Sequence, residues 1–118
     1  MALRDKLAER AAPFLEPGEQ VRYVFQAQEG PSPWLLGALF QRYRIVCVTD
    51  RAVVVLSIPK MRGKPDGVIA RLPRNTEIGR MSGIFGKTRI TGKKMYVHRR
   101  FHKDVAAADA EVVRAAAR

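Results

Sequence analysis

Two runs of β-branched residues in the middle of the chain constrain its fold more than any other feature. Residues 42–48 (Arg-Tyr-Arg-Ile-Val-Cys-Val) and 52–58 (Ala-Val-Val-Val-Leu-Ser-Ile) have the composition that is typical of strands. Only Thr49, Asp50 and Arg51 separate the two runs, and an aspartate in so short a connection accepts hydrogen bonds from nearby amides. We therefore predict an antiparallel hairpin at the centre of the fold.

Weaker β signals flank this hairpin on both sides. In residues 21–28 apolar and mostly polar side chains alternate, as they do in a half-buried strand. Glycine and proline punctuate four further short runs, at 68–72, 77–81, 87–91 and 94–98. About seven short strands at a spacing of roughly ten residues predict a mainly β fold, an antiparallel sandwich or barrel.

Amphipathic helices are expected at both ends of the chain. Residues 1–14 show an apolar stripe at helical spacing, and Pro13 disfavours helical geometry in the residue before it, so this short N-terminal helix ends near Ala12. The stripe comprises Leu3, Leu7, Ala11 and Phe14. A second stripe near the C-terminus comprises Phe101, Val105, Ala108, Val112 and Ala115. A length of 118 residues favours a single domain, in which residues 15–118 follow the first helix.

The chain's positive charge is concentrated in one stretch. Residues 60–103 carry thirteen Lys and Arg against two acids, a surplus of eleven that equals the net charge of the whole chain, +11. A one-sided field of this kind attracts a polyanion, whether an acidic membrane surface, a nucleic acid or an acidic protein. Outward residues of neighbouring antiparallel strands share one surface, so we expect a basic face. Its expected anion-binding or membrane-binding residues are Lys60, Arg62, Lys64, Lys87, Arg89, Lys93 and Lys94.

Residues with catalytic or metal-binding chemistry are scarce. His98 and His102 are four apart, a spacing that places two metal ligands on one helical face, but three neighbouring basic residues would repel a cation. Cys47 lies in an apolar run with no neighbour to activate its thiolate, and a lone cysteine fits a reducing compartment. We expect no catalytic residue, no metal site and no cofactor. We expect a cytoplasmic protein. Peripheral attachment to the inner face of the cell membrane is compatible with this expectation.

A short apolar segment between the first two expected strands needs a partner. It contains Trp34, Leu35, Leu36, Leu39 and Phe40. Burial of each side chain contributes roughly 1.5–3 kcal/mol, and the run is far below the about 20 residues that span a bilayer. Three destinations stay open: the domain's own core, a homodimer or partner interface, and an interfacial anchor in a membrane surface.

The order of the expected elements resembles the pleckstrin-homology (PH-like) fold, and more narrowly the small bacterial PH-like domains of unknown function. The likeness is carried by the turn Leu15–Glu19, by the hairpin corner Val48–Arg51 and by the closing helix. It implies two nearly orthogonal sheets with one end closed by the final helix, and a binding role without a fixed activity. Many PH domains hold phosphoinositide heads with paired basic residues in the first loop between strands. Residues 30–41 contain no Lys or Arg, so that type of recognition does not carry over.

Three functions follow as hypotheses. The first is a non-catalytic PH-like binding module that engages an anionic membrane surface, or a membrane-associated protein partner, through the basic face. The alternative is a nucleic-acid-binding module, which a pI of about 10.7 and the aromatics Phe85, Tyr96 and Phe101 among cations support, although Phe101 fits the helix stripe better. A third is a homo-oligomeric or protein-interaction scaffold that uses Trp34–Phe40.

Overall fold

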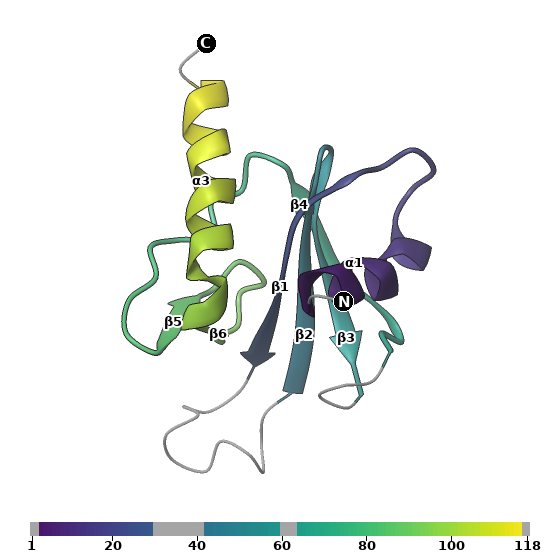
Figure 1. The fold of residues 1–118 in the computed structure, drawn as a ribbon, viewed down its shortest axis with the longest axis horizontal. Coiled ribbons are helices and arrows are strands. Elements are labelled where there is room, and N and C mark those ends of the chain that lie inside the picture. Colours follow the sequence, from purple (N-terminus) through teal and green to yellow (C-terminus); the bar gives the residue numbers. More distant parts are fainter. Residues whose placement is uncertain (1–2, 30–41, 60–63, 117–118) are drawn as a thin grey trace.

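A computed structural model describes residues 3–29, 42–59 and 64–116 of the chain. Its centre is an antiparallel sheet of six strands in the order β4-β3-β2-β1-β6-β5 (Figure 1). The strands are β1 (Val21–Glu29), β2 (Arg42–Thr49), β3 (Ala52–Ile58), β4 (Gly67–Pro73), β5 (Phe85–Thr88) and β6 (Met95–His98). The mainly β architecture with flanking helices is confirmed, but the described residues form six strands rather than the seven expected.

The central hairpin β2–β3 is the most deeply buried part of the sheet. Consecutive side chains from Arg44 to Thr49, and again from Ala52 to Leu56, are buried. Because successive residues of a strand point to opposite faces, both faces of the sheet are covered here. Helix α1 (Leu3–Ala11) packs on one face of the sheet, against β1 and β2 (Figure 1). The β-branched composition that predicts the hairpin therefore fills a core on both sides.

Two tight turns fasten the start of β1 to the corner between β2 and β3. Pro17 and Gly18 form the centre of a turn in which the Glu19 amide donates to the Glu16 carbonyl at 3.0 Å, with Gly18 at a φ of +80°. At the other turn, the Asp50 carboxylate accepts from the Gln20 amide at 2.9 Å. The predicted capacity of Asp50 to bind a nearby amide is thus used to hold two turns together.

The expected strand at residues 77–81 does not form. The amides of Ile78 and Gly79 donate instead to the two carboxylate oxygens of Asp109, at 2.8 and 2.9 Å. Gly79 has a φ of +117°, which an extended strand does not have. The segment is therefore held by a helix side chain and not by a neighbouring strand, and Ile78 is buried against the core.

The expected strands at 87–91 and 94–98 form a hairpin whose first strand begins and ends earlier. β5 covers Phe85–Thr88, and the chain turns at once, because the Gly92 amide donates to the Arg89 carbonyl at 2.9 Å. Gly86 fits here because its backbone touches Met81: a Cβ at this position would lie 2.1 Å from the Met81 sulfur.

Both expected helices are present. α1 ends at Ala11 and continues as a 3₁₀ turn at Ala12–Phe14, which agrees with the expected effect of proline. A second 3₁₀ turn, Arg99–Phe101, leads into α3 (His102–Ala116), which stands beside β1 above the β5–β6 pair (Figure 1). The buried residues of the C-terminal stripe are Phe101, Val105, Ala108 and Val112, whereas Ala115 is exposed.

Candidate anion-binding surface

The longest stretch of basic sequence without an acid folds as the hairpin at one edge of the sheet. Residues 78–103 contain eight Lys and Arg and no Asp or Glu. This stretch includes β5, β6 and the connection between them, and we call residues 85–98 the edge hairpin. Since β5 is the last strand of the sheet, one side of this hairpin has no neighbouring strand within the part of the chain that the structure describes.

Four of the expected anion-binding residues lie together on the edge hairpin. Lys87 is on β5 opposite Tyr96, and Arg89, Lys93 and Lys94 lie on the connection to β6. Lys87, Arg89 and Lys93 are exposed and Lys94 is half-buried. Their grouping follows from the hairpin, which brings residues on both sides of a tight turn to one end of the sheet.

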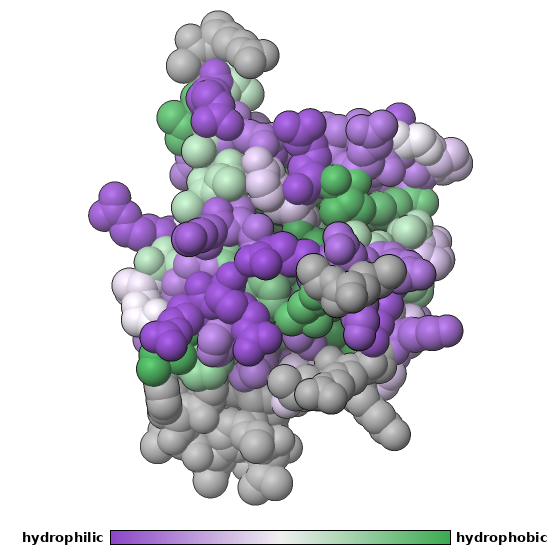
Figure 2. Space-filling model, viewed as in Figure 1, coloured by the Kyte–Doolittle hydropathy of each residue, from purple (hydrophilic) through white to green (hydrophobic). Residues whose placement is uncertain are grey.

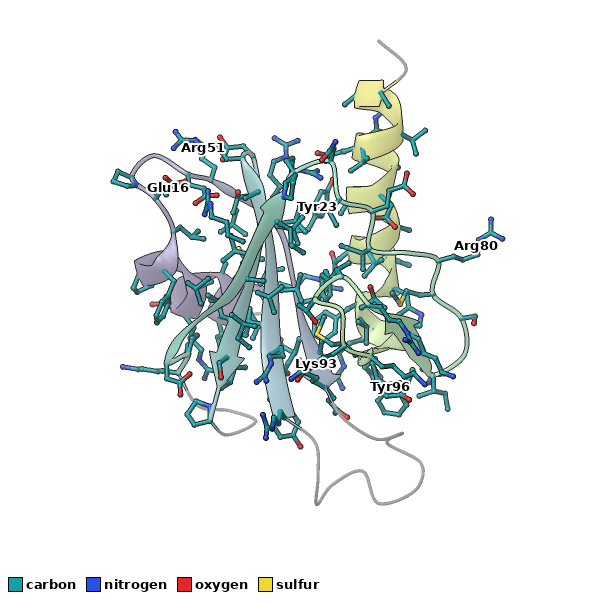
Figure 3. All side chains as sticks on the ribbon, turned by 180° about the vertical axis from the view of Figure 1, so that it is seen from behind. Glu16, Tyr23, Arg51, Arg80, Lys93 and Tyr96 are labelled. Carbon is teal, nitrogen blue, oxygen red and sulfur yellow. The ribbon has the colours of Figure 1, made fainter. Side chains whose placement is uncertain are left out.

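Of the other expected cations, the structure describes Lys64, and it lies apart from this group. Lys64 is exposed and precedes β4, at the opposite edge of the sheet. Because strand directions alternate, the β3–β4 and β5–β6 connections lie at the same end of the sheet, although they lie at opposite edges of it. Figure 3 shows Lys93 and Tyr96 at that end, with Glu16 and Arg51 at the other. Lys60, Arg62 and the apolar set Trp34, Leu35, Leu36, Leu39 and Phe40 lie outside the described residues.

Several arginines elsewhere in the described residues are paired with carboxylates. Arg4 contacts Asp104 at 2.7 Å, and Arg74 contacts Glu111 at 3.1 Å. In the interior, Arg44 lies 3.4 Å from Glu29. These partners come from different segments of the chain, so no local sequence pattern predicts the pairs. They leave the positive charge of those regions compensated.

The cations of the edge hairpin have no such compensation. Among residues 3–29, 42–59 and 64–116, no carboxylate lies within the 4.0 Å of an ion pair from Lys87, Arg89, Lys93 or Lys94. Uncompensated cations on an exposed edge keep their full attraction for an external anion. The structure thus separates a paired set of basic residues from an unpaired one.

An aromatic hollow of about 250 Å³ lies on the hairpin beside β1. Its lining comprises Gln26, Gln28, Phe85, Tyr96, His98, Arg100 and Phe101. The rings of Phe85 and His98 meet edge to face, with centroids 5.6 Å apart. Tyr96 and Phe101 are only 4% and 3% exposed, so their rings pack inside the protein and present almost no surface to a ligand.

The two histidines near this hollow are each engaged with the backbone. His98 Nδ1 accepts from the Arg100 amide at 3.1 Å, and His102 Nε2 lies 2.8 Å from the Val97 carbonyl oxygen. Burial lowers the pKa of His98, and the positive charges of Arg100 and its neighbours lower it further. In the described part of the chain, no three His, Cys, Asp or Glu side chains gather in a way that suits a metal ion.

Cys47 is completely buried in β2. Burial, with a smaller contribution from the negative charge of Glu19, raises the pKa of its thiol to about 12. A thiol in this state is protonated at neutral pH and is a poor nucleophile.

A second hollow, lined by basic residues, is not predicted by the sequence. It lies between α1 and the residues that precede β4, and it brings Lys6 and Arg10 next to Lys64. Helical spacing on α1 shows which residues face outward, but no sequence signal links that face to a segment more than fifty residues away.

No protein-family model, curated protein or solved structure matches the chain. None of the helices in the described residues has the length and apolar character needed to cross a bilayer. What the chain does is therefore inferred from the charge and shape of its surface.

Proposed function

We propose that this chain is a non-catalytic, PH-like binding module that docks on an anionic membrane surface through the edge hairpin. The observation that carries the proposal is the unpaired state of Lys87, Arg89, Lys93 and Lys94, on a hairpin within a stretch that has no acid.

The expected strength of this docking follows from the number of cations. Each basic residue near an anionic bilayer contributes roughly 1 kcal/mol, so the four hairpin cations supply roughly 4 kcal/mol. Arg99, Arg100 and Lys103 continue the basic stretch and raise the total to roughly 7 kcal/mol. These energies correspond to dissociation constants between about 1 mM and about 10 µM. The module therefore binds weakly and reversibly.

An exposed apolar residue lies at the base of the hairpin, at the end away from the connection between β5 and β6. Ile84 is 42% exposed, and its carbonyl accepts from the Arg99 amide at 2.8 Å. An exposed aliphatic side chain beside arginines suits the boundary between lipid headgroups and acyl chains.

The nucleic-acid alternative has less support. Single-stranded nucleic acid binds to sequence-tolerant modules by stacking bases on exposed aromatic rings, in addition to its contacts with cations. Of the three aromatics on which that hypothesis depends, Tyr96 and Phe101 are buried and only Phe85 is partly exposed. A charged surface without stacking platforms favours a lipid surface over a single strand.

The PH-like assignment is also a proposal. It is supported by the closing helix, which follows the last strand and packs on β1, and by the turn at Pro17 and Gly18 that leads into the first strand. The sheet of the described residues is continuous from β4 to β5, whereas the resemblance implies two sheets.

Vesicle co-sedimentation tests the proposal. We expect binding to vesicles of phosphatidylglycerol and phosphatidylcholine, little binding to phosphatidylcholine alone, and a steep loss between about 0.1 M and 1 M salt, as the screening length falls from about 10 Å to 3 Å. A single-stranded oligonucleotide is titrated in the same buffer. Equal, weak binding to both vesicles together with tight binding to the oligonucleotide would refute the membrane assignment.

A further inference from the structure

A hollow of about 640 Å³ lies under the N-terminal helix, away from the edge hairpin. Its walls come from α1, from the 3₁₀ turn that follows, and from the two residues at which the described chain resumes before β4. The lining residues are Lys6, Glu9, Arg10, Pro13, Phe14, Lys64 and Pro65. In Figure 1, α1 and its 3₁₀ turn lie beside the connection that leads into β4.

The hollow combines an apolar wall with cations from two distant segments. Phe14 is half-buried and packs against the core, and Pro13 and Pro65 extend this apolar surface. Lys6 and Arg10 reach it from α1, one helical turn apart, and Lys64 reaches it from the other side. Figure 2 shows the face that carries α1 covered mostly by hydrophilic side chains, with apolar patches between them.

The charge of the hollow selects the class of ligand. Three cations face one carboxylate, that of Glu9, and none of the three cations has an ion pair with an acid of the described residues. The part of the lining that the described residues supply is thus positive by two charges. A phosphomonoester carries about −1.5 to −2 at neutral pH, whereas a single carboxylate carries −1 and leaves one charge uncompensated. A volume of about 640 Å³ lies within the roughly 300–1,000 Å³ of small-molecule sites.

We infer that this hollow binds a phosphomonoester that carries an apolar group. Lys6, Arg10 and Lys64 bind the phosphate oxygens, with Arg10 supplying the planar fork that matches them, and Phe14 packs against the apolar group. Two sources share this chemistry: a soluble organic phosphate, and the exposed headgroup of phosphatidic acid. The site does not depend on the edge hairpin, because β4 and β5 form opposite edges of the sheet.

Titrations monitored by amide NMR shifts test the inference on the complete chain. The probes are phenyl phosphate, dihexanoyl phosphatidic acid below its micelle-forming concentration, inorganic phosphate, and dihexanoyl phosphatidylcholine. We expect at least one of the two monoesters to bind at least tenfold more tightly than inorganic phosphate and the phosphatidylcholine, with shifts gathered at α1 and residues 64–65. Preference for phenyl phosphate identifies a soluble ligand, and preference for phosphatidic acid identifies a lipid headgroup.

Paired variants separate this site from the membrane-docking surface. Arg10→Gln with Lys64→Gln is expected to weaken binding of the preferred monoester at least tenfold, while Lys93→Gln with Lys94→Gln leaves it within about twofold, since the latter residues lie at the other edge. Lys64→Gln alone, at an exposed position, serves as the second variant if the double change unfolds the protein. Inorganic phosphate binding as tightly as both monoesters, or unchanged monoester binding in the Arg10 and Lys64 variants, overturns the inference.

Discussion

Replacing Glu19 by glutamine tests how the turns of this fold are held together. The Glu19 side chain is completely buried, and Arg71 donates to both of its carboxylate oxygens, at 3.0 and 2.8 Å. Thr49 Oγ1 also donates to this carboxylate, as does the Glu16 amide at 2.9 Å. Burial on its own raises the pKa of the Glu19 carboxyl, but these donors outweigh burial and lower that pKa from 4.5 to about 2. One carboxylate thus joins the turn before β1, the corner between β2 and β3, and the edge strand β4.

The size of the effect follows from the pKa. One pKa unit corresponds to about 1.4 kcal/mol, so a change from 4.5 to about 2 corresponds to about 3 kcal/mol of folding free energy. The folded-state pKa lies below the unfolded-state value, so this stabilisation is complete above about pH 4.5 and is lost as the pH falls to about 2. Glu19→Gln keeps the shape of the side chain and removes the charge. We expect the variant to lose about 3 kcal/mol near neutral pH, which lowers Tm by about 10 °C.

Urea unfolding of wild type and Glu19→Gln at several pH values between about 7 and 2 measures this difference. The gap in unfolding free energy should shrink to a small fraction as the pH approaches 2, since the wild-type carboxylate becomes protonated as the pH falls through its folded-state pKa of about 2. Glu16→Gln is the matched control: Glu16 also contacts Arg71, but its side chain is 59% exposed, and we expect a loss below about 1 kcal/mol. Equal stability of Glu19→Gln and wild type near neutral pH, or a gap as large at pH 2 as near neutral pH, would refute the reasoning.

Three further predictions concern the packing around the sheet. Asp109→Ala removes the acceptor of the Ile78 and Gly79 amides. We expect the free energy of unfolding to fall by about 1–3 kcal/mol and amide exchange in residues 77–81 to become faster. Gly86→Ala places a Cβ 2.1 Å from the Met81 sulfur and should cost about 1–3 kcal/mol in thermal unfolding; Met81→Ala restores only part of this loss in the double variant, because the Cβ of residue 81 itself lies 2.8 Å from the added Cβ. The Cys47 thiol, buried and with a pKa of about 12, should react with a disulfide reagent only as fast as the protein unfolds, so rapid labelling of the native protein contradicts the buried placement.

The local parts of the fold were predictable from the sequence. The hairpin of residues 42–58 is encoded by two β-branched runs and a short polar connection, all within seventeen residues. The helices were predictable for the same reason, because their apolar stripes are periodic over short windows. These elements needed no knowledge of what they would pack against.

The error at residues 77–81 has a non-local cause. Pro73 and Gly83 punctuate this segment as they would a short strand, but two of its amides are bound by Asp109, about thirty residues further along the chain. A side chain on a helix competes here with strand pairing, and local pattern contains no information about that competitor.

The candidate surface was predictable only where it is contiguous in sequence. Four of the expected cations lie within eight consecutive residues of one hairpin, so their charge density along the sequence already predicts that they lie together. They are Lys87, Arg89, Lys93 and Lys94. Lys64 was grouped with them by charge alone, whereas the fold places it at the other edge, against α1. Pairing of arginines with distant carboxylates, which distinguishes compensated from uncompensated charge, also depends on the tertiary fold.

Membrane docking by the edge hairpin is tested most directly by two double variants that remove equal charge. Lys93→Gln with Lys94→Gln removes two hairpin cations, whereas Arg51→Gln with Arg114→Gln removes two exposed cations elsewhere; Figure 3 shows Arg51 at the end of the sheet opposite Lys93. At roughly 1 kcal/mol per residue, the hairpin variant should bind phosphatidylglycerol-containing vesicles about thirtyfold more weakly than wild type, and the control should stay within about threefold. Equal weakening by the two variants would show that vesicle binding follows net charge alone and would contradict a docking role for the hairpin.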